Sequence, residues 1–154
     1  MKYIWRDYIP EGAEYIELWL DGEAVRMTGL DDGWKNFFEY WKNEDNITLN
    51  DNYWCKVVFD GDTPFGIVAL SVWDESFNIM ELLVDPKLRG QGRGSALLKE
   101  LIEKGDKIIG KSINNAEAVI YPNNPASQKA FENAGFTFDH TSDEGDALYY
   151  VLKR

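Results

Sequence analysis

The residues best suited to chemistry form a glycine-rich loop between a predicted strand and a predicted helix. Glycine recurs at positions 90, 92 and 94, after the apolar run Phe77–Val84 and before the helical pattern of Ser95–Lys104. Alternating glycines let a backbone approach a ligand closely, and the free N–H groups that begin a helix attract anions. The stretch 86–99 also carries four basic residues and no acidic one: Lys87, Arg89, Arg93 and Lys99. The loop therefore predicts a site for a polyanion, with phosphates as the natural candidate.

Two widespread phosphate-binding loops are not expected here. The dinucleotide fingerprint G-x-G-x-x-G, started at Gly92, needs a third glycine where Leu97 stands. The Walker A loop, which ends in Gly-Lys-Ser or Gly-Lys-Thr, is not expected either.

A carboxylate inside an apolar strand is the best candidate for acid–base chemistry. Glu81 interrupts the run Ile79–Val84, where an unpaired buried carboxylate is costly. It either acts as a general base or faces solvent or a salt-bridge partner. His140 and Cys55 are the only histidine and cysteine, and each is interpreted as a structural residue of a predicted strand.

The elements from residue 53 onward must position these groups. The apolar spacing predicts a three-stranded meander, then a helix, a strand, a second helix and a closing hairpin. The strands are Tyr53–Phe59, Phe65–Trp73, Phe77–Val84, Glu117–Tyr121, Phe136–His140 and Ala147–Leu152, and the helices are Ser95–Lys104 and Asn124–Ala134. Because strands outnumber helices and alternate with them only partly, we expect an α+β fold with a mixed sheet flanked by helices.

The first 50 residues predict two further features. Asp21-Gly22 favours a two-residue turn, so Tyr15–Leu20 and Ala24–Met27 are predicted to pair as a hairpin. A helix follows, with Asp31 or Asp32 as its N-cap. Its aromatic face consists of Trp34, Phe37, Phe38 and Trp41. This face is interpreted mainly as core, but its acidic neighbours (Asp31, Asp32, Glu39, Glu44 and Asp45) would also suit a cationic amine.

Length and composition limit the function classes. A chain of 154 residues, 44% hydrophobic and 28% charged, suits one domain over residues 1–154. The net charge of -11 disfavours nucleic acids and anionic membranes as partners. No run without Asp, Glu, Lys or Arg is longer than Thr63–Trp73, which is too short for the ~18 residues of a spanning helix. We therefore expect a cytoplasmic protein without a metal site, nucleic-acid partner or membrane partner.

Two motifs resemble the signatures of the GNAT superfamily of N-acetyltransferases. Arg89-x-x-Gly92-x-Gly94 is similar to its acyl-CoA signature, Q/R-x-x-G-x-G/A. The second signature, N-x-x-A/S followed by Y-E-x-x-G-F, resembles Asn124 to Ser127 followed by Phe131 to Phe136. The resemblance spans Tyr53 to Leu152 and implies a GNAT-like fold whose mixed, mostly antiparallel sheet is splayed near Val84. It makes residues 53–152 the acyl-CoA-binding core and residues 1–50 the variable, acceptor-side part.

The resemblance also implies roles for individual residues. Backbone groups of Leu82 and Val84 would pair with the pantetheine arm of acetyl-CoA, and the Val84 N–H would polarise the thioester carbonyl. Backbone amides of residues 90–95 would hold the pyrophosphate, and the Asn124 side chain would touch the pantetheine. The implied acetyl-CoA-binding set is Leu82, Leu83, Val84, Arg89, Gly90, Gln91, Gly92, Arg93, Gly94, Ser95, Asn124, Ser127 and Phe131.

The chain departs from the family at the proton donor. The family usually supplies a carboxylate to accept the amine proton and a tyrosine to protonate the CoA thiolate, but that tyrosine is Phe131 here. Tyr121, Tyr149 or Tyr150 could replace it, and Tyr121 is the candidate named for this role, although each also suits a sheet aromatic. The thiolate could also leave unprotonated, because thiol pKa values near ~8.5 make it a tolerable leaving group.

These observations predict an acetyl-CoA-dependent transfer of an acetyl group to a primary amine by direct attack in a ternary complex. A small cationic amine is the first acceptor class, and a protein N-terminus or lysine is the second. A catalytically weak CoA-binding sensor or partner-binding domain is the alternative from another class. A homodimer is the candidate protein assembly.

Overall fold

The structure, a computed structural model, describes residues 1–28, 30, 33–40 and 52–154. Its strands are β1 (Ile4–Asp7), β2 (Tyr53–Asp60), β3 (Thr63–Trp73), β4 (Ser76–Val84), β5 (Asn115–Ile120), β6 (Thr137–Thr141) and β7 (Leu148–Lys153). Its helices are α1 (Tyr15–Trp19), α2 (Gly22–Thr28), α3 (Trp34–Tyr40), α5 (Arg93–Glu103), α6 (Gly105–Ile108) and α7 (Pro125–Asn133), with a 3-10 turn, η2, at Pro86–Leu88. Within this described part, no helix is long and apolar enough to cross a membrane.

All seven strands form one sheet in the order β1-β2-β3-β4-β5-β7-β6. Every neighbouring pair is antiparallel except β4 and β5, which run parallel because α5 and α6 connect them. The expected α+β fold, with a mixed and mostly antiparallel sheet flanked by helices, is confirmed.

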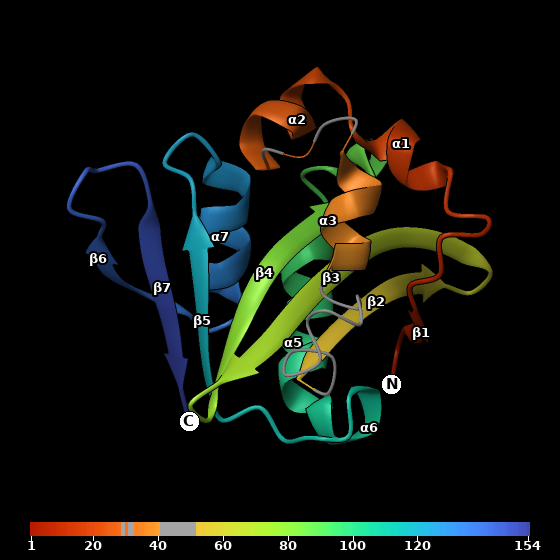
Figure 1. Cartoon of the computed structure of the whole chain (residues 1–154). Coiled ribbons are helices and arrows are strands. Elements are labelled where there is room, and N and C mark those ends of the chain that lie inside the picture. The colour runs from red at the N-terminus through yellow and green to blue at the C-terminus, as the bar shows by residue number, and fades with distance from the viewer. Residues whose placement is uncertain (29, 31–32, 41–51) are drawn as a thin grey trace.

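The sheet splits between its two parallel strands. β4 and β5 pair only where Phe77–Ile79 lie beside Ala116–Ala118. Directly after Ile79, the register with β3 shifts and Met80 becomes the extra residue of a bulge. The two strands then diverge toward their carboxyl ends (Figure 1). The splay expected near Val84 therefore begins several residues earlier, at the bulge.

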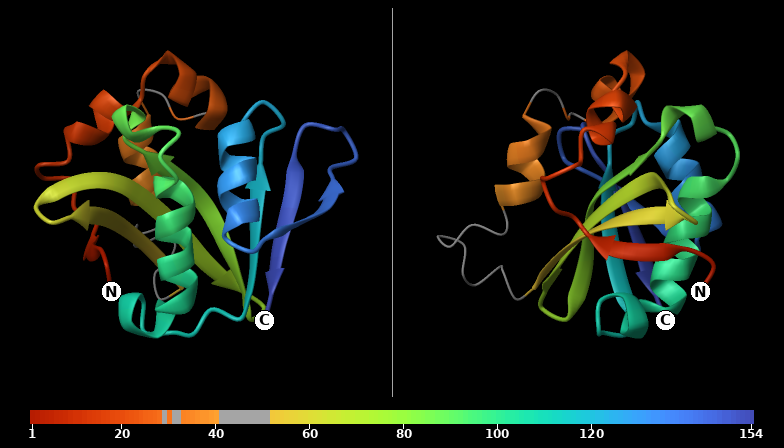
Figure 2. Two further views of the ribbon diagram at one scale, coloured as in Figure 1. Left: turned by 180° about the vertical axis from the view of Figure 1, so that it is seen from behind. Right: turned by 90° about the vertical axis from the view of Figure 1, so that its right-hand side faces the viewer.

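Helices cover the two faces of the sheet differently. One core contains buried residues of α5 and α7 (Leu97, Leu98, Leu101 and Phe131) against the sheet. A second core lies under the N-terminal helices and contains Ile16, Trp19, Ala24, Trp34 and Phe38. Seen edge-on, α3 and α5 lie on opposite sides of the sheet (Figure 2).

The predicted hairpin around Asp21-Gly22 is wrong, because both of its arms are helical. Ile16 and Trp19 of α1 are buried three residues apart, which is helical rather than strand spacing. Asp21 accepts a hydrogen bond from the Ala24 N–H at 2.8 Å and so caps the start of α2. An Asp-Gly pair suits a turn and a helix start alike, and here it begins a helix.

The aromatic helix is confirmed as α3. Trp34 and Phe38 are buried in the core under the N-terminal helices, with ring centroids 6.4 Å apart, and Phe37 packs beside them. Of the acidic neighbours, Glu39 lies in α3; the other residues of that hypothesis, Asp31, Asp32, Trp41, Glu44 and Asp45, lie outside the described residues.

Candidate active site

The split exposes one edge of β4. The Asp85 N–H donates to the Phe65 carbonyl at 2.8 Å, so this pair is a hydrogen-bonded pair of the β3–β4 ladder. Such pairs alternate along antiparallel strands, so Leu83 also bonds toward β3. Leu82 and Val84 occupy the alternate positions. Their N–H and C=O groups therefore point to the other edge of β4, from which β5 has diverged. A strand-like ligand can pair there.

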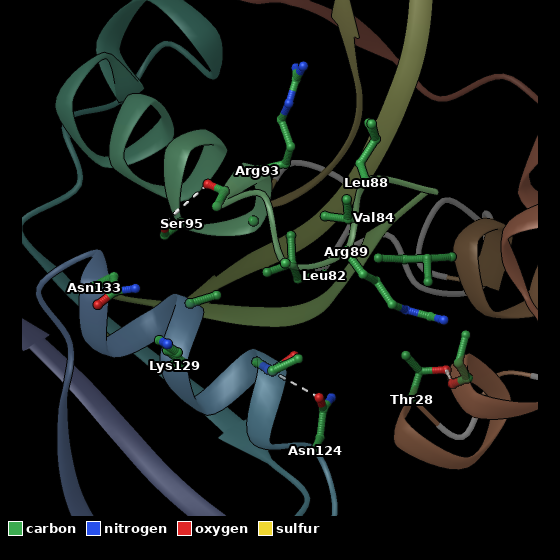
Figure 3. A pocket seen from close by; sticks show the side chains of 18 of the residues that line it. Thr28, Leu82, Val84, Leu88, Arg89, Arg93, Ser95, Asn124, Lys129 and Asn133 are labelled. Atoms are coloured by element: carbon green, nitrogen blue, oxygen red, sulfur yellow. Dashed lines mark hydrogen bonds between the residues drawn. The ribbon is translucent and has the colours of Figure 1, made fainter. Parts of the chain in front are cut away.

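A cavity of about 520 Å³ lies beside this edge (Figure 3). Its lining includes most of the predicted acetyl-CoA set: Leu82, Leu83, Val84, Arg89, Gly90, Gly92, Arg93, Gly94, Ser95, Asn124 and Ser127. Gln91 and Phe131 are not in this lining. Sequence reasoning missed Glu23, Ala24 and Thr28 of α2 and Lys129 of α7, which also line the cavity. The three α2 residues lie far along the chain from both motifs, and Lys129 stands between the two halves of the second motif, so none of the four carried a signal.

The loop glycines serve two different geometric needs. Gly90 and Gly92 have φ values of +76° and +73°, and Gly92 is the left-handed residue that caps α5. A Cβ on either would meet open space. A Cβ on Gly94 would lie 3.4 Å from the Ala130 Cβ, so this glycine allows α5 to approach α7. The loop thereby presents the first N–H groups of an 11-residue helix to the cavity.

Two of the four loop cations are paired with acids from elsewhere. Arg89 contacts Asp21 and Glu23, and Arg93 donates to Asp60 at 2.7 Å while lying over the Phe65 ring. Figure 3 shows the Arg93 side chain turned away from the cavity. The basic stretch therefore offers less unpaired positive charge than its composition predicted. Its backbone N–H groups are then the main hydrogen-bond donors for an anion.

Asn124 has a structural role in addition to its predicted one. It is the N-cap of α7, and its side-chain oxygen accepts from the Ser127 N–H at 3.1 Å. The side chain is largely buried but still lines the cavity. Its predicted contact with pantetheine stays a prediction.

A smaller cavity of about 230 Å³ adjoins the first and shares Thr28, Leu82, Asn124 and Ser127 with it. Glu81 lines this smaller cavity. Burial raises the pKa of Glu81 to about 8, partly offset by a hydrogen bond from the Leu82 N–H at 3.3 Å. A carboxyl with this pKa can take a proton from an amine near neutral pH.

The candidate proton donors fall in different places. Tyr121 is 47% exposed and lines the smaller cavity together with Phe131. Phe131 is otherwise buried, with its ring edge-on to Phe136 at 5.0 Å. Tyr150 is buried and donates to Glu132 at 3.1 Å, and Tyr149 stacks on His140 at 4.4 Å. Of the tyrosines proposed from sequence, Tyr121 is the one that lines the same cavity as Glu81.

The remaining reactive residues lie outside both cavities. Cys55 is buried in the core under the N-terminal helices. His140 is exposed on β6, beside Asp139 at 2.6 Å. Across the described part of the chain, no group of three or more His, Cys, Asp or Glu side chains could hold a metal ion.

The prediction against a Walker A loop rests on the absence of its closing triplet, and that ground is wrong. The full pattern occurs at Gly105–Ser112, including the triplet Gly110-Lys111-Ser112. A Walker A loop connects a strand to a following helix, whereas this stretch begins in α6 and leads to β5. The match therefore lacks the helix N-terminus that would hold phosphates.

The model of the acetyltransferase (GNAT) family matches residues 15–136. The chain belongs to this family. It is also 28% identical over 141 residues to the uncharacterized N-acetyltransferase YfmK of Bacillus subtilis (strain 168), covering 90% of this chain and 88% of that protein. Family membership confirms the predicted enzyme class, an acetyl-CoA-dependent N-acetyltransferase.

Solved structures share the fold at low sequence identity. AAC(6')-Ib in complex with ribostamycin and coenzyme A has a TM-score of 0.75 at 18% identity, covering 100% of this chain and 94% of that one. Spermidine N-acetyltransferase from Vibrio cholerae, with CoA and spermine, has a TM-score of 0.72 at 14% identity, covering 98% and 95%. The GNAT-like fold is thus confirmed, and the co-substrate is acetyl-CoA.

Proposed function

We propose that this protein acetylates a small cationic primary amine by direct attack on acetyl-CoA in a ternary complex. One observation carries the proposal: Glu81, with its raised pKa, lines a cavity that adjoins the split of the sheet. Acetyl-CoA would occupy the larger cavity, and the amine would enter the smaller one. We place the acyl-CoA-binding core at residues 53–152 and the acceptor side at residues 1–50 of one domain.

The proposed mechanism begins with the proton of the amine. An alkylammonium with a pKa near ~10.4 must lose a proton before its nitrogen can attack. The ionised Glu81 carboxylate accepts this proton, directly or through water. The nitrogen then attacks the thioester carbonyl, whose oxygen accepts from the Val84 N–H. As the C–N bond forms, the nitrogen releases its second proton to solvent; the C–S bond then breaks, and the electron pair leaves on the CoA sulfur.

The sulfur leaves as a thiolate or takes a proton from Tyr121. Tyr121 lines the cavity that contains Glu81, and the residue is 47% exposed, so solvent can return the proton that it gives up. We therefore propose Tyr121 as the general acid. A covalent intermediate on the only cysteine is disfavoured, because the thiol of Cys55 is buried in a different part of the protein.

The chemistry of the smaller cavity supports a cationic acceptor. Its lining combines the Glu81 carboxyl with the aromatic side chains of Phe37, Tyr121 and Phe131. Carboxylates and aromatic faces both attract cations. The two structural relatives named above, whose complexes contain ribostamycin and spermine, agree with this acceptor class.

An amine panel tests the proposal. Thiol release from acetyl-CoA is measured with spermine, kanamycin, a lysine-containing peptide blocked at its N-terminus, and a peptide with a free N-terminus. We expect turnover with spermine or kanamycin to exceed that with either peptide. Faster turnover of a peptide would favour protein acetylation, and CoA binding without any turnover would indicate a sensor.

Replacing Phe131 with tyrosine tests the missing proton donor. The ring lines the smaller cavity, so we expect the added hydroxyl to face this space and the fold to be retained. A hydrogen bond to a developing thiolate contributes about 1.5–3 kcal/mol. Steady-state rates should therefore rise if thiolate departure limits turnover and otherwise stay unchanged.

Phe136→Tyr is the matched control, because this ring is buried against Phe131 outside both cavity linings. It should lower the melting temperature, while Phe131→Tyr should not. A Phe131→Tyr variant that melts several degrees lower, without rescue by acetyl-CoA, would show that position 131 belongs only to the core.

A further inference from the structure

We propose that Arg89 is a positioning residue, which ties α2 to the glycine loop and so holds one wall of the acceptor cavity in place. This role rests on the proposed function, because the smaller cavity is taken as the acceptor site. It differs from the expectation that Arg89 binds acetyl-CoA directly. Arg89 makes these contacts with a segment more than 60 residues away in the sequence.

The contact between Arg89 and α2 is bidentate. Arg89 Nη1 donates to Asp21 Oδ2 at 2.8 Å, and Nη2 donates to Asp21 Oδ1 at 2.9 Å. Nη1 also approaches Glu23 Oε2 at 3.4 Å. Two parallel hydrogen bonds fix the relative orientation of guanidinium and carboxylate. Figure 3 shows the Arg89 side chain directed toward Thr28 and away from α7.

Asp21 transmits this restraint to the helix. The same carboxylate accepts from the Ala24 N–H at 2.8 Å and caps α2, while the Val25 N–H donates to the Asp21 carbonyl at 2.9 Å. The hydrogen bonds from Arg89 and from the Ala24 N–H hold the pKa of Asp21 at about 2. The carboxylate therefore stays ionised, and its pair with Arg89 stays intact, throughout the neutral range.

The other end of α2 is tied to the opposite side of the split. Asn123, in the loop between β5 and α7, donates through Nδ2 to the Arg26 carbonyl at 3.3 Å. Arg89 follows β4, so α2 bridges the loops after the two strands that diverge. Figure 1 shows α2 above the open end of this split. Thr28, at the end of α2, lines both cavities.

The two carboxylates that contact Arg89 allow a positioning role of this arginine to be distinguished from a role in phosphate binding alone. Asp21 and Glu23 place two carboxylates beside a cavity meant for phosphates, and Glu23 lines that cavity itself. If Arg89 served only the phosphates, removing the Asp21 charge would free the guanidinium and strengthen CoA binding. If Arg89 positions α2, the same change should release the helix.

The test compares Arg89→Gln, Asp21→Asn and the double variant. Asparagine can still accept from the Ala24 N–H, so Asp21→Asn keeps the helix cap and removes the ion pair. Asp7→Asn, which removes the Lys56 partner on β1, is the control for loss of one carboxylate. The measurements are amide hydrogen exchange at residues 24–28, CoA affinity by calorimetry, and the acceptor KM and kcat with spermine.

We expect both single variants to speed exchange at residues 24–28 by about three- to tenfold, and the double variant to add nothing further. Melting temperatures and the CoA affinity of Asp21→Asn should match the Asp7→Asn control. The KM for spermine should rise several-fold with a smaller change in kcat. Wild-type exchange in both singles, or additive effects in the double variant, would overturn the proposal. The exchange measurement needs no acceptor, so it decides this proposal even if the amine panel is negative.

Discussion

Glu81→Gln is expected to lower kcat/KM for the acceptor by about 100-fold, within the usual range for removal of a general base. Glutamine keeps the size of the side chain and its place in the lining of the smaller cavity, but it cannot accept the proton of an ammonium ion. CoA affinity should stay unchanged, because Glu81 is absent from the lining of the larger cavity. Initial rates at varied amine concentration, together with CoA calorimetry, check both halves of this expectation.

The pH dependence gives the same variant a second readout. With a pKa of about 8, roughly one Glu81 carboxyl in ten is ionised at pH 7. The wild-type kcat/KM should therefore rise with pH and level off above pH 8, and Glu81→Gln should lose this limb of the profile. Glu117→Gln on β5, also a strand glutamate, is the matched control and should retain it. Near-native rates in Glu81→Gln would assign the base to water or to another carboxylate.

Stability should respond to pH with a defined sign. The pKa of Glu81 is raised on folding, so between about pH 4.5 and 8 the native protein binds more protons at this residue than the unfolded chain does. Its contribution to stability is therefore fully present at low pH and is lost as the pH rises through about 8. The melting temperature of Glu81→Gln should approach that of wild type at pH 5 and exceed it at pH 9.

Gly92→Asp is expected to abolish the rise in melting temperature that acetyl-CoA produces by binding only the native state. Position 92 caps α5, and a Cβ there would meet open space, so the new carboxylate would stand where the phosphates are expected. Repulsion between the carboxylate and the phosphates should exclude the ligand. Gly94→Asp should have the same effect and should also crowd Ala130.

Backbone strain has to be separated from this charge effect. Gly145, in the turn between β6 and β7, has a φ of +76°, close to the +73° of Gly92, and a Cβ there would also meet open space. Gly145→Asp should therefore lower the melting temperature to a similar extent and keep the acetyl-CoA shift. Gly92→Ala should keep part of the shift, because it adds strain without charge. An unchanged shift in Gly92→Asp and Gly94→Asp would remove the loop from the site.

Features that depend on neighbouring residues could be predicted from the sequence. The glycine loop, the helix that follows it and the alternation of the meander strands are encoded within about a dozen residues each. These local signals were enough to predict the α+β fold and the enzyme family. Local signals also misled where one motif suits two structures. Asp21-Gly22 was predicted to form a hairpin turn and instead begins a helix.

Only the tertiary structure decided what surrounds these motifs. Arg89 and Arg93 meet Asp21 and Asp60, which are 68 and 33 residues away in the sequence, so the free charge of the loop could not be read from its composition. The raised pKa of Glu81 depends on desolvation in a cavity between β4, α7 and the N-terminal helices. Burial and pairing are properties of the three-dimensional neighbours of a group, and those neighbours are set when the chain folds.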